Sequence, residues 1–149
     1  MAPSTELLIG DAGADHVLIR PLTRTHPGLF DAGDGSGIDC EVEIAAGGFR
    51  ASFRADLRSE EFQAFLDGVQ GLRQALDGAA SFTASDGQIA LSLTAGDDGQ
   101  VRVSGDAVDA AGANRLRFGF DLDQTFLPTI CESLEHLLAA YPVTDSPAV

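Results

Sequence analysis

Apolar and polar residues alternate along most of this chain, a pattern that predicts β-strands. The clearest pair of strands flanks the two glycines Gly47-Gly48. A two-residue turn at these glycines sets Ala46 opposite Phe49 and, further out, Glu41 opposite Arg54. The turn and the alternation give the same register, which indicates a β-hairpin.

Two further turns organise the second half of the chain. Asp86-Gly87 reads as a two-residue turn that pairs Phe82 with Leu91. A two-residue turn within Asp97-Asp98-Gly99 would oppose Leu93 to Ser104 and turn an apolar residue to the wrong face. A three-residue loop with Gly99 in the left-handed conformation restores Leu93 opposite Val103. We therefore expect a three-stranded meander whose last strand covers residues 101–107.

Two segments change to the helical period of 3.6 residues. The first begins at Ser59, which can cap a helix, and ends at Asp77-Gly78. Its apolar stripe comprises Phe62, Phe65, Leu66, Val69, Leu72 and Leu76. The second follows a predicted strand over residues 115–122; Asp123 or Thr125 can cap it, and Pro142 stops it.

The chain opens with two predicted strands, residues 5–9 and 17–22, and Pro21 suggests an edge position for the second. The element order is therefore ββββαββββα. It predicts an α+β fold with one antiparallel sheet of about seven or eight strands and both helices on one face. We expect a single domain over 1–149, with a flexible loop at 23–37 and a disordered tail at 144–149.

The net charge is −14, from 23 acidic residues and nine arginines, with no lysine. Phosphate contacts need a basic face, so this balance argues against binding nucleic acid or an anionic membrane surface. It favours a cationic partner or simply solubility. No targeting segment or membrane-spanning run is evident, and Cys40 and Cys131 fall on apolar faces, as expected of buried thiols in the cytoplasm.

The sequence contains no pattern typical of catalysis or of a bound cofactor. Its three histidines, His16, His26 and His136, are far apart, and it has neither an H-E-x-x-H motif nor a nucleophile elbow. The acidic and glycine-rich stretch 31–39 lacks the spacing of a calcium loop, although its spacing alone does not decide whether it binds an ion. We therefore predict a protein that is not an enzyme and has no cofactor, catalytic residue or metal ligand.

A polar sheet face is the best candidate for binding. In the predicted registers, small side chains lie at its centre and charged side chains around it, an arrangement that could seat a partner; a merely solvated face is the alternative. The members of this face are Asp39, Glu41, Glu43, Arg50, Ser52, Arg54, Ser81, Thr83, Ala90, Ser92, Arg102, Ser104, Arg115 and Arg117. The partner-binding hypothesis rests on Asp39, Glu41, Glu43, Arg54, Arg102 and Arg117.

Short motifs spread over residues 38–143 resemble the WapI family of immunity proteins, bacterial proteins that neutralise a toxin domain delivered by a neighbouring cell. The C-terminal block carries the resemblance most clearly, with Leu122-Asp-Gln-Thr-Phe-Leu-Pro128 and Ala139-Ala-Tyr-Pro-Val143. The other pieces, in order, are Glu41-Val-Glu43, Gly48-Phe-Arg50, Phe53-Arg-Ala-Asp-Leu-Arg58, Leu91-Ser-Leu93, Gly99-Gln-Val-Arg-Val103 and Asn114-Arg-Leu-Arg-Phe118. The family commonly carries a tryptophan just before the strand that begins here at Ile38, and this chain has no tryptophan.

The resemblance implies a cytoplasmic protein that binds a cognate toxin domain and blocks it without catalysis. If that toxin acts on nucleic acid, its cleft is basic, and the acidic row Asp39, Glu41 and Glu43 is the expected steering feature. The runner-up is a regulatory module that binds a ligand or protein through the same sheet face, and an enzyme comes third. The toxin's identity and the oligomeric state are left open by the sequence.

Overall fold

The computed structural model describes residues 5–24, 37–75, 78–85, 87–96, 98–109 and 112–143. The element order ββββαββββα is confirmed, with a short 3-10 helix, η2, before the last α-helix. The elements are β1 (Leu7–Gly10), β2 (His16–Arg24), β3 (Gly37–Ala46), β4 (Phe49–Arg58), α1 (Ser59–Ala75), β5 (Ala79–Thr83), β6 (Ile89–Ala95), β7 (Gln100–Val108), β8 (Arg115–Asp123), η2 (Gln124–Phe126) and α2 (Leu127–Ala140).

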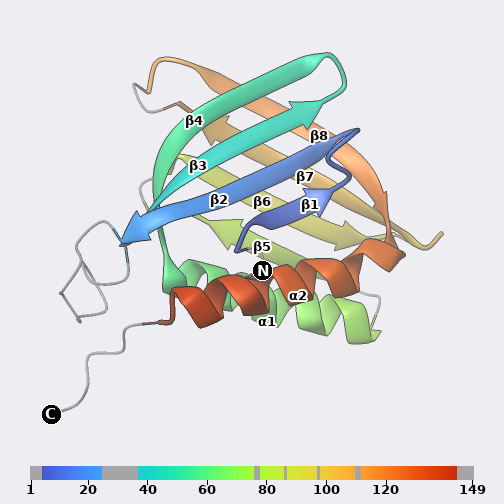
Figure 1. Ribbon diagram of the computed structural model, residues 1–149. Coiled ribbons are helices and arrows are strands. Elements are labelled where there is room, and N and C mark those ends of the chain that lie inside the picture. Colours follow the sequence, from blue (N-terminus) through green and yellow to red (C-terminus); the bar gives the residue numbers. More distant parts are fainter. Residues whose placement is uncertain are drawn as a thin grey trace, which may run out of the picture.

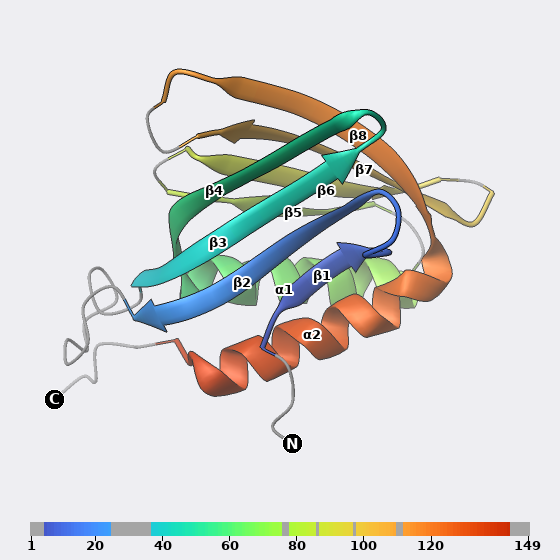
Figure 2. The same cartoon turned by 45° about the horizontal axis from the view of Figure 1, so that its top comes forward.

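The α+β class is confirmed, but the strands form two sheets and not the single sheet expected. β1-β2-β3-β4 make one four-stranded antiparallel sheet, sheet A, and β5-β6-β7-β8 make the other, sheet B. The strands of the two sheets run in different directions across each other (Figures 1 and 2). The inner faces of both sheets and the apolar stripes of both helices belong to one buried cluster.

The two helices lie side by side and cover the side of the molecule where β1 and β5 form the sheet edges (Figure 1). Helix α1 contacts β5, and α2 contacts β1. Phe62 and Phe65 of α1 pack on Phe82 of β5, with ring centroids 5.0 and 5.9 Å away. Gly68 permits this approach, since a Cβ atom there would lie 3.1 Å from the Cβ of Ala80. The other two edges, β4 and β8, lie away from the helices.

The predicted registers within each half are confirmed. Ala46 pairs with Phe49 and Glu41 with Arg54 in the β3–β4 hairpin. In sheet B, Phe82 pairs with Leu91 and Leu93 with Val103. Alternation fixes the face and the turn fixes the offset, so hairpin registers are the part of the fold that a sequence specifies most directly.

The expectation of an edge position for Pro21 is wrong. Strand β2 lies between β1 and β3, and Pro21 sits where the β2–β3 register shifts. Proline is tolerated here because β1 pairs with β2 only as far as Ile19. The missing N–H of Pro21 therefore removes no hydrogen bond to β1.

The start of α1 connects three parts of the fold. Glu61 accepts a hydrogen bond from the backbone N–H of Arg58 at 2.9 Å, an interaction resembling a capping box. Its second carboxylate oxygen accepts from the backbone N–H of Ser85 at 2.7 Å. The hydroxyl of buried Ser59 donates to the carbonyl of Tyr141 at 2.9 Å, so Ser59 links α1 to the end of α2. Asp123 accepts from the backbone N–H of Thr125, but the helix that it caps is the short η2; α2 itself follows with Phe126 at its N-cap and no side-chain cap.

Several expected features lie outside the described residues, namely 25–36 of the loop, Leu76, Asp77, Asp86 and the tail 144–149. Among the helices that are described, none is long and apolar enough to cross a membrane.

Gly99 has a φ of 81°, as the three-residue loop requires. The Gly99→Val substitution should lower stability by about 1–2 kcal/mol, because it places a β-branched residue in the left-handed region. A Cβ atom there meets nothing closer than 3.8 Å, so the cost comes from the backbone alone. Thermal melting should show a decrease of several degrees. The exposed neighbour Gln100→Val is the matched control, and equal melting temperatures for the two variants would contradict the loop assignment.

Candidate functional site

The outer face of sheet B carries a shallow concavity of about 430 Å³. Small side chains from three neighbouring strands form its floor, because alternate positions of each strand point away from the core. These residues are Ser81, Thr83, Ala90, Ser92 and Ser104, all members of the predicted sheet face. Gly105 also lines it and cannot carry a side chain, since a Cβ atom would lie 2.6 Å from the Phe118 ring.

Two ion pairs flank this concavity on β7 and β8. Arg117 Nε lies 3.2 Å from Asp106 Oδ1, and both residues line the hollow. Arg102 Nη1 lies 3.4 Å from Asp121 Oδ1, and its guanidinium lies against Gly119. All four side chains are exposed, so these pairs add little to stability. The face is therefore polar and accessible, with both signs of charge at one side.

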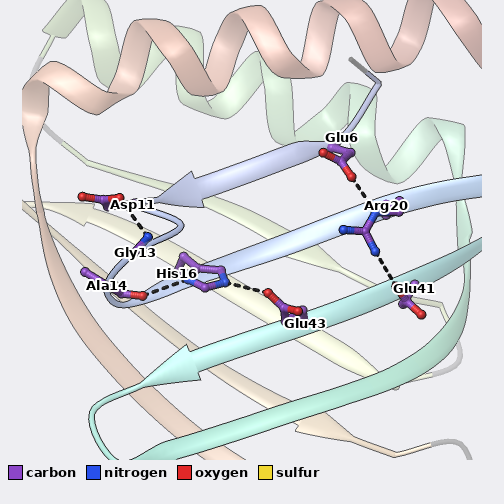
Figure 3. A network of polar contacts seen from close by, with 8 residues as sticks. All are labelled: Glu6, Asp11, Gly13, Ala14, His16, Arg20, Glu41 and Glu43. Atoms are coloured by element: carbon purple, nitrogen blue, oxygen red, sulfur yellow. Dashed lines mark hydrogen bonds and ion pairs between the residues drawn. The ribbon is translucent and has the colours of Figure 1, made fainter.

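The outer face of sheet A is built on charge pairs that connect strands (Figure 3). Arg20 of β2 lies between Glu6 and Glu41, with nitrogen–oxygen distances of 2.5 Å to each. Arg54 of β4 forms an ion pair with Asp39. The acidic row Asp39, Glu41 and Glu43 is thus opposed by a basic side chain at every member.

The remaining member of the row, Glu43, pairs with a buried histidine. His16 is 2% exposed; its Nδ1 lies 2.8 Å from the carbonyl of Ala14 and its Nε2 lies 2.9 Å from Glu43 (Figure 3). A carbonyl only accepts, so Nδ1 carries a proton; an ionised Glu43 then requires a proton on Nε2 as well. The geometry therefore favours the imidazolium form of His16.

The pKa shifts agree with this geometry. Burial alone would lower the pKa of His16, but its hydrogen bonds to Glu43 and Ala14 outweigh burial and raise it from the ordinary 6.5. The hydrogen bond from His16 lowers the pKa of Glu43 from 4.5. The pair links β2 to β3, and the contact of His16 with Ala14 extends this link to the β1–β2 turn, so Glu43 contributes to the stability of the fold.

The structure does not bring the six predicted partner-binding residues together. Asp39, Glu41, Glu43 and Arg54 lie on sheet A, whereas Arg102 and Arg117 lie on sheet B. Arg54 faces Glu41 in the register as predicted, yet its guanidinium pairs with Asp39, and Arg20 pairs with Glu41. A partner-binding role for these residues remains a prediction.

Sequence reasoning missed the roles of Glu6, His16 and Arg20. They depend on the β2–β3 register, in which Arg20 faces Glu41. A long connection separates these strands, so no turn fixes their offset. The pairing of His16 with Glu43 could have been predicted only from the offset between β2 and β3, and no sequence motif specifies that offset.

Other candidate chemistry finds no support in the described part of the chain. No group of three His, Cys, Asp or Glu residues there could hold a metal ion. Cys40 and Cys131 are buried, as expected, and burial raises the pKa of both thiols. Asp31 and Asp34 of the possible ion-binding stretch lie outside the described residues.

The fold and the surfaces define an α+β protein with polar, exposed sheet faces. The family model described as the immunity protein WapI-like family matches residues 7–142, so the chain belongs to this family of immunity proteins. The resemblance read from the sequence is thereby confirmed, and family membership associates the chain with immunity to a toxin. No curated protein matches the chain.

Two solved structures share the fold at low identity. A structure of MRP1/MRP2 from Trypanosoma has a TM-score of 0.50 at 8% identity, covering 95% of this chain and 88% of that one. The plant transcriptional regulator PBF-2 has a TM-score of 0.52 at 11% identity, covering 94% and 84%. At these identities the likeness concerns the fold alone.

The His16–Glu43 pair predicts a pH-dependent stability. The raised pKa of His16 means that its contribution is full below about pH 6.5 and is lost as the pH rises through the folded-state value. The lowered pKa of Glu43 means that its contribution is present above about pH 4.5 and is lost as the pH falls through the folded-state value. Urea unfolding should show Glu43→Gln less stable than the parent at about pH 5.5.

At about pH 9 the difference should shrink or reverse, because neutral His16 would direct a lone pair at the carboxylate of Glu43. The control is Glu132→Gln on the exposed face of α2, which should show no such change. A Glu43→Gln deficit of the same size at both pH values would contradict a charged His16.

Proposed function

We propose that the protein binds a cognate toxin domain and neutralises it by protein–protein contact, without catalysis, in the cytoplasm. Membership in the WapI-like family gives the class of partner. The concavity on sheet B supports this proposal as a candidate binding surface, because it is broad, exposed and floored by small, mostly polar side chains. Small side chains let a partner approach the sheet backbone closely, and the flanking arginines offer several hydrogen-bond donors.

The opposing proposal is a regulatory module that uses the same face for another ligand or protein. In both proposals the partner binds at the concavity, so they differ only in whether that partner is a toxin domain or another ligand or protein. Rescue of cells from a toxin separates them, since a regulatory module has no effect on toxin activity.

The proposal predicts that a neighbouring gene encodes the cognate toxin domain, and the first test combines co-expression and binding with that domain. The parent should restore growth, whereas Ser92→Trp should fill the concavity and lose rescue. Loss of a binding hot spot corresponds to at least about thirtyfold weaker affinity, measurable by calorimetry. Ser92 lies on the outer face of β6, so the variant should fold normally.

Gln74→Trp is the matched control, because it adds the same side chain to an exposed position of α1. Full binding by Ser92→Trp would exclude this face as the interface while leaving toxin immunity intact. Failure of the parent to bind or to rescue would exclude the proposed function itself.

The net charge of −14 supports a further expectation, that the toxin domain is basic. Long-range attraction would then speed association at low salt, and salt would slow it while changing dissociation little. Asp39, Glu41 and Glu43 are each paired with a basic side chain, so the acidic row contributes little net charge. We therefore attribute the attractive field to the net charge of the whole protein. Stopped-flow association across a salt series measures the effect, and a salt-independent association rate would contradict steering.

Reversing Glu43 is a poor probe of steering in this protein. Glu43→Arg would place a second cation beside buried His16 and destabilise β2. Exposed acids on α2 are better choices, because Glu132→Gln and Glu135→Gln change the net charge without breaking any of the ion pairs of sheet A. Together they should reduce the salt dependence slightly, as expected for two of many charges.

A further inference from the structure

The edges formed by β4 and β8 lie on the side of the molecule away from the helices (Figures 1 and 2). Between the first half of β4 and the start of β8 lies a cleft of about 260 Å³. Phe49, Phe53 and Leu116 contribute its apolar surface, and Arg50, Ser52 and Arg115 contribute polar groups. This cleft is separate from the concavity on sheet B.

The apolar part of the cleft is incompletely covered. Phe49 is 67% exposed, one of two large hydrophobic residues exposed in the described part of the chain. Phe53 and Leu116 are only partly buried, and both pack against the edge of the core. The volume lies below the range of about 300–1,000 Å³ that is usual for small-molecule pockets. It suits one inserted side chain better than a cofactor.

The backbone of β4 is unpaired on the side facing the cleft. The side-chain amide of Gln88 donates to the carbonyl of Arg54 at 3.1 Å, so this carbonyl points away from β3. In an antiparallel pair, every second residue turns both backbone groups to the same side. Arg50 and Ser52 therefore direct their N–H and C=O groups away from β3, and within the described residues nothing bonds to them.

The charges at the cleft differ from those of the rest of the surface. Arg20, Arg54, Arg102 and Arg117 all have ion-pair partners, whereas Arg50 and Arg115 have none among the described residues. Asp109 lines the same cleft as an ionised carboxylate, because the side-chain amide of Asn114 donates a hydrogen bond to it at 2.7 Å and lowers its pKa. The lining therefore carries two arginines, Arg50 and Arg115, against one carboxylate, and this local excess of positive charge in an acidic protein favours a carboxylate-bearing partner.

We propose that this cleft receives an extended segment of a partner protein by β-strand addition. The segment pairs its backbone with Arg50 and Ser52 and inserts an apolar side chain between Phe53 and Leu116. Alternate residues of a strand point to opposite faces, so the residues flanking the apolar one face the arginines. The expected sequence of the partner segment is therefore an apolar residue with an acidic residue on each side. The proposal goes beyond the toxin-binding face, and it does not depend on which protein supplies the segment.

The test uses the full ¹⁵N-labelled chain and the peptide acetyl-Thr-Glu-Phe-Glu-Thr-amide. Its addition should shift the amide signals of Arg50, Ser52 and Leu116 in a saturable way. A peptide with Lys in place of Glu, and one with N-methylated backbone amides, should each bind at least about tenfold more weakly. Equal binding of all three peptides, or no shifts at these amides, would overturn the proposal.

Variants of the protein separate the backbone from the charge. Ser52→Pro removes a free N–H at an edge strand, where proline is tolerated, and should abolish the shifts while the remaining spectrum is retained. Arg115→Glu should weaken binding about tenfold, and Arg115→Lys should retain most of it. Arg73→Glu on α1 makes the same charge change outside the cleft and should bind like the parent.

Parent-like binding by both Ser52→Pro and Arg115→Glu would overturn the proposal. Dilution of the protein without peptide is the remaining control. Concentration-dependent shifts of the same amides would show that a second copy of the chain occupies the cleft, which also overturns it. The probe is a peptide and not the toxin domain, so these experiments can fail while toxin binding succeeds, and the reverse.

Discussion

Burial of one face of each sheet in a shared core determines what this protein can present to a partner. An extended strand turns alternate side chains in opposite directions, so the core positions of β5–β8 fix the outer row that floors the concavity. Each sheet also has two edges, and the helices can cover only those at β1 and β5. The surfaces available for recognition are therefore the outer faces and the edges of β4 and β8.

The net charge of this protein is strongly negative, but many of its charged side chains form pairs of opposite sign between neighbouring strands. Four arginines, Arg20, Arg54, Arg102 and Arg117, each pair with a carboxylate on a neighbouring strand or element, and the buried His16 pairs with Glu43. Such pairs contribute modestly to stability when exposed, but they determine where unmatched charge remains. Arg50 and Arg115 have no such pair among the described residues and line one cleft, a placement that the sequence alone does not reveal.

Much of the fold could be predicted, because hairpin turns and alternation act over short stretches of chain. The offsets around Gly47-Gly48 and Gly99 were determined in this way, as was the apolar stripe of α1. The division into two sheets could not be predicted, since the alternation within a strand does not say which edges meet after a helix intervenes. The polar partners were missed for a related reason: Arg20 meets Glu41 through a register set across a long connection.

The central claim is that neutralisation proceeds by binding and not by turnover of the toxin. Residual toxin activity, measured against increasing amounts of this protein at toxin concentrations well above the dissociation constant, tests it directly. Stoichiometric binding predicts a linear fall that ends at a fixed molar ratio and does not change with incubation time. Progressive inactivation by much less than one molecule of this protein per toxin would contradict the claim and would indicate catalysis.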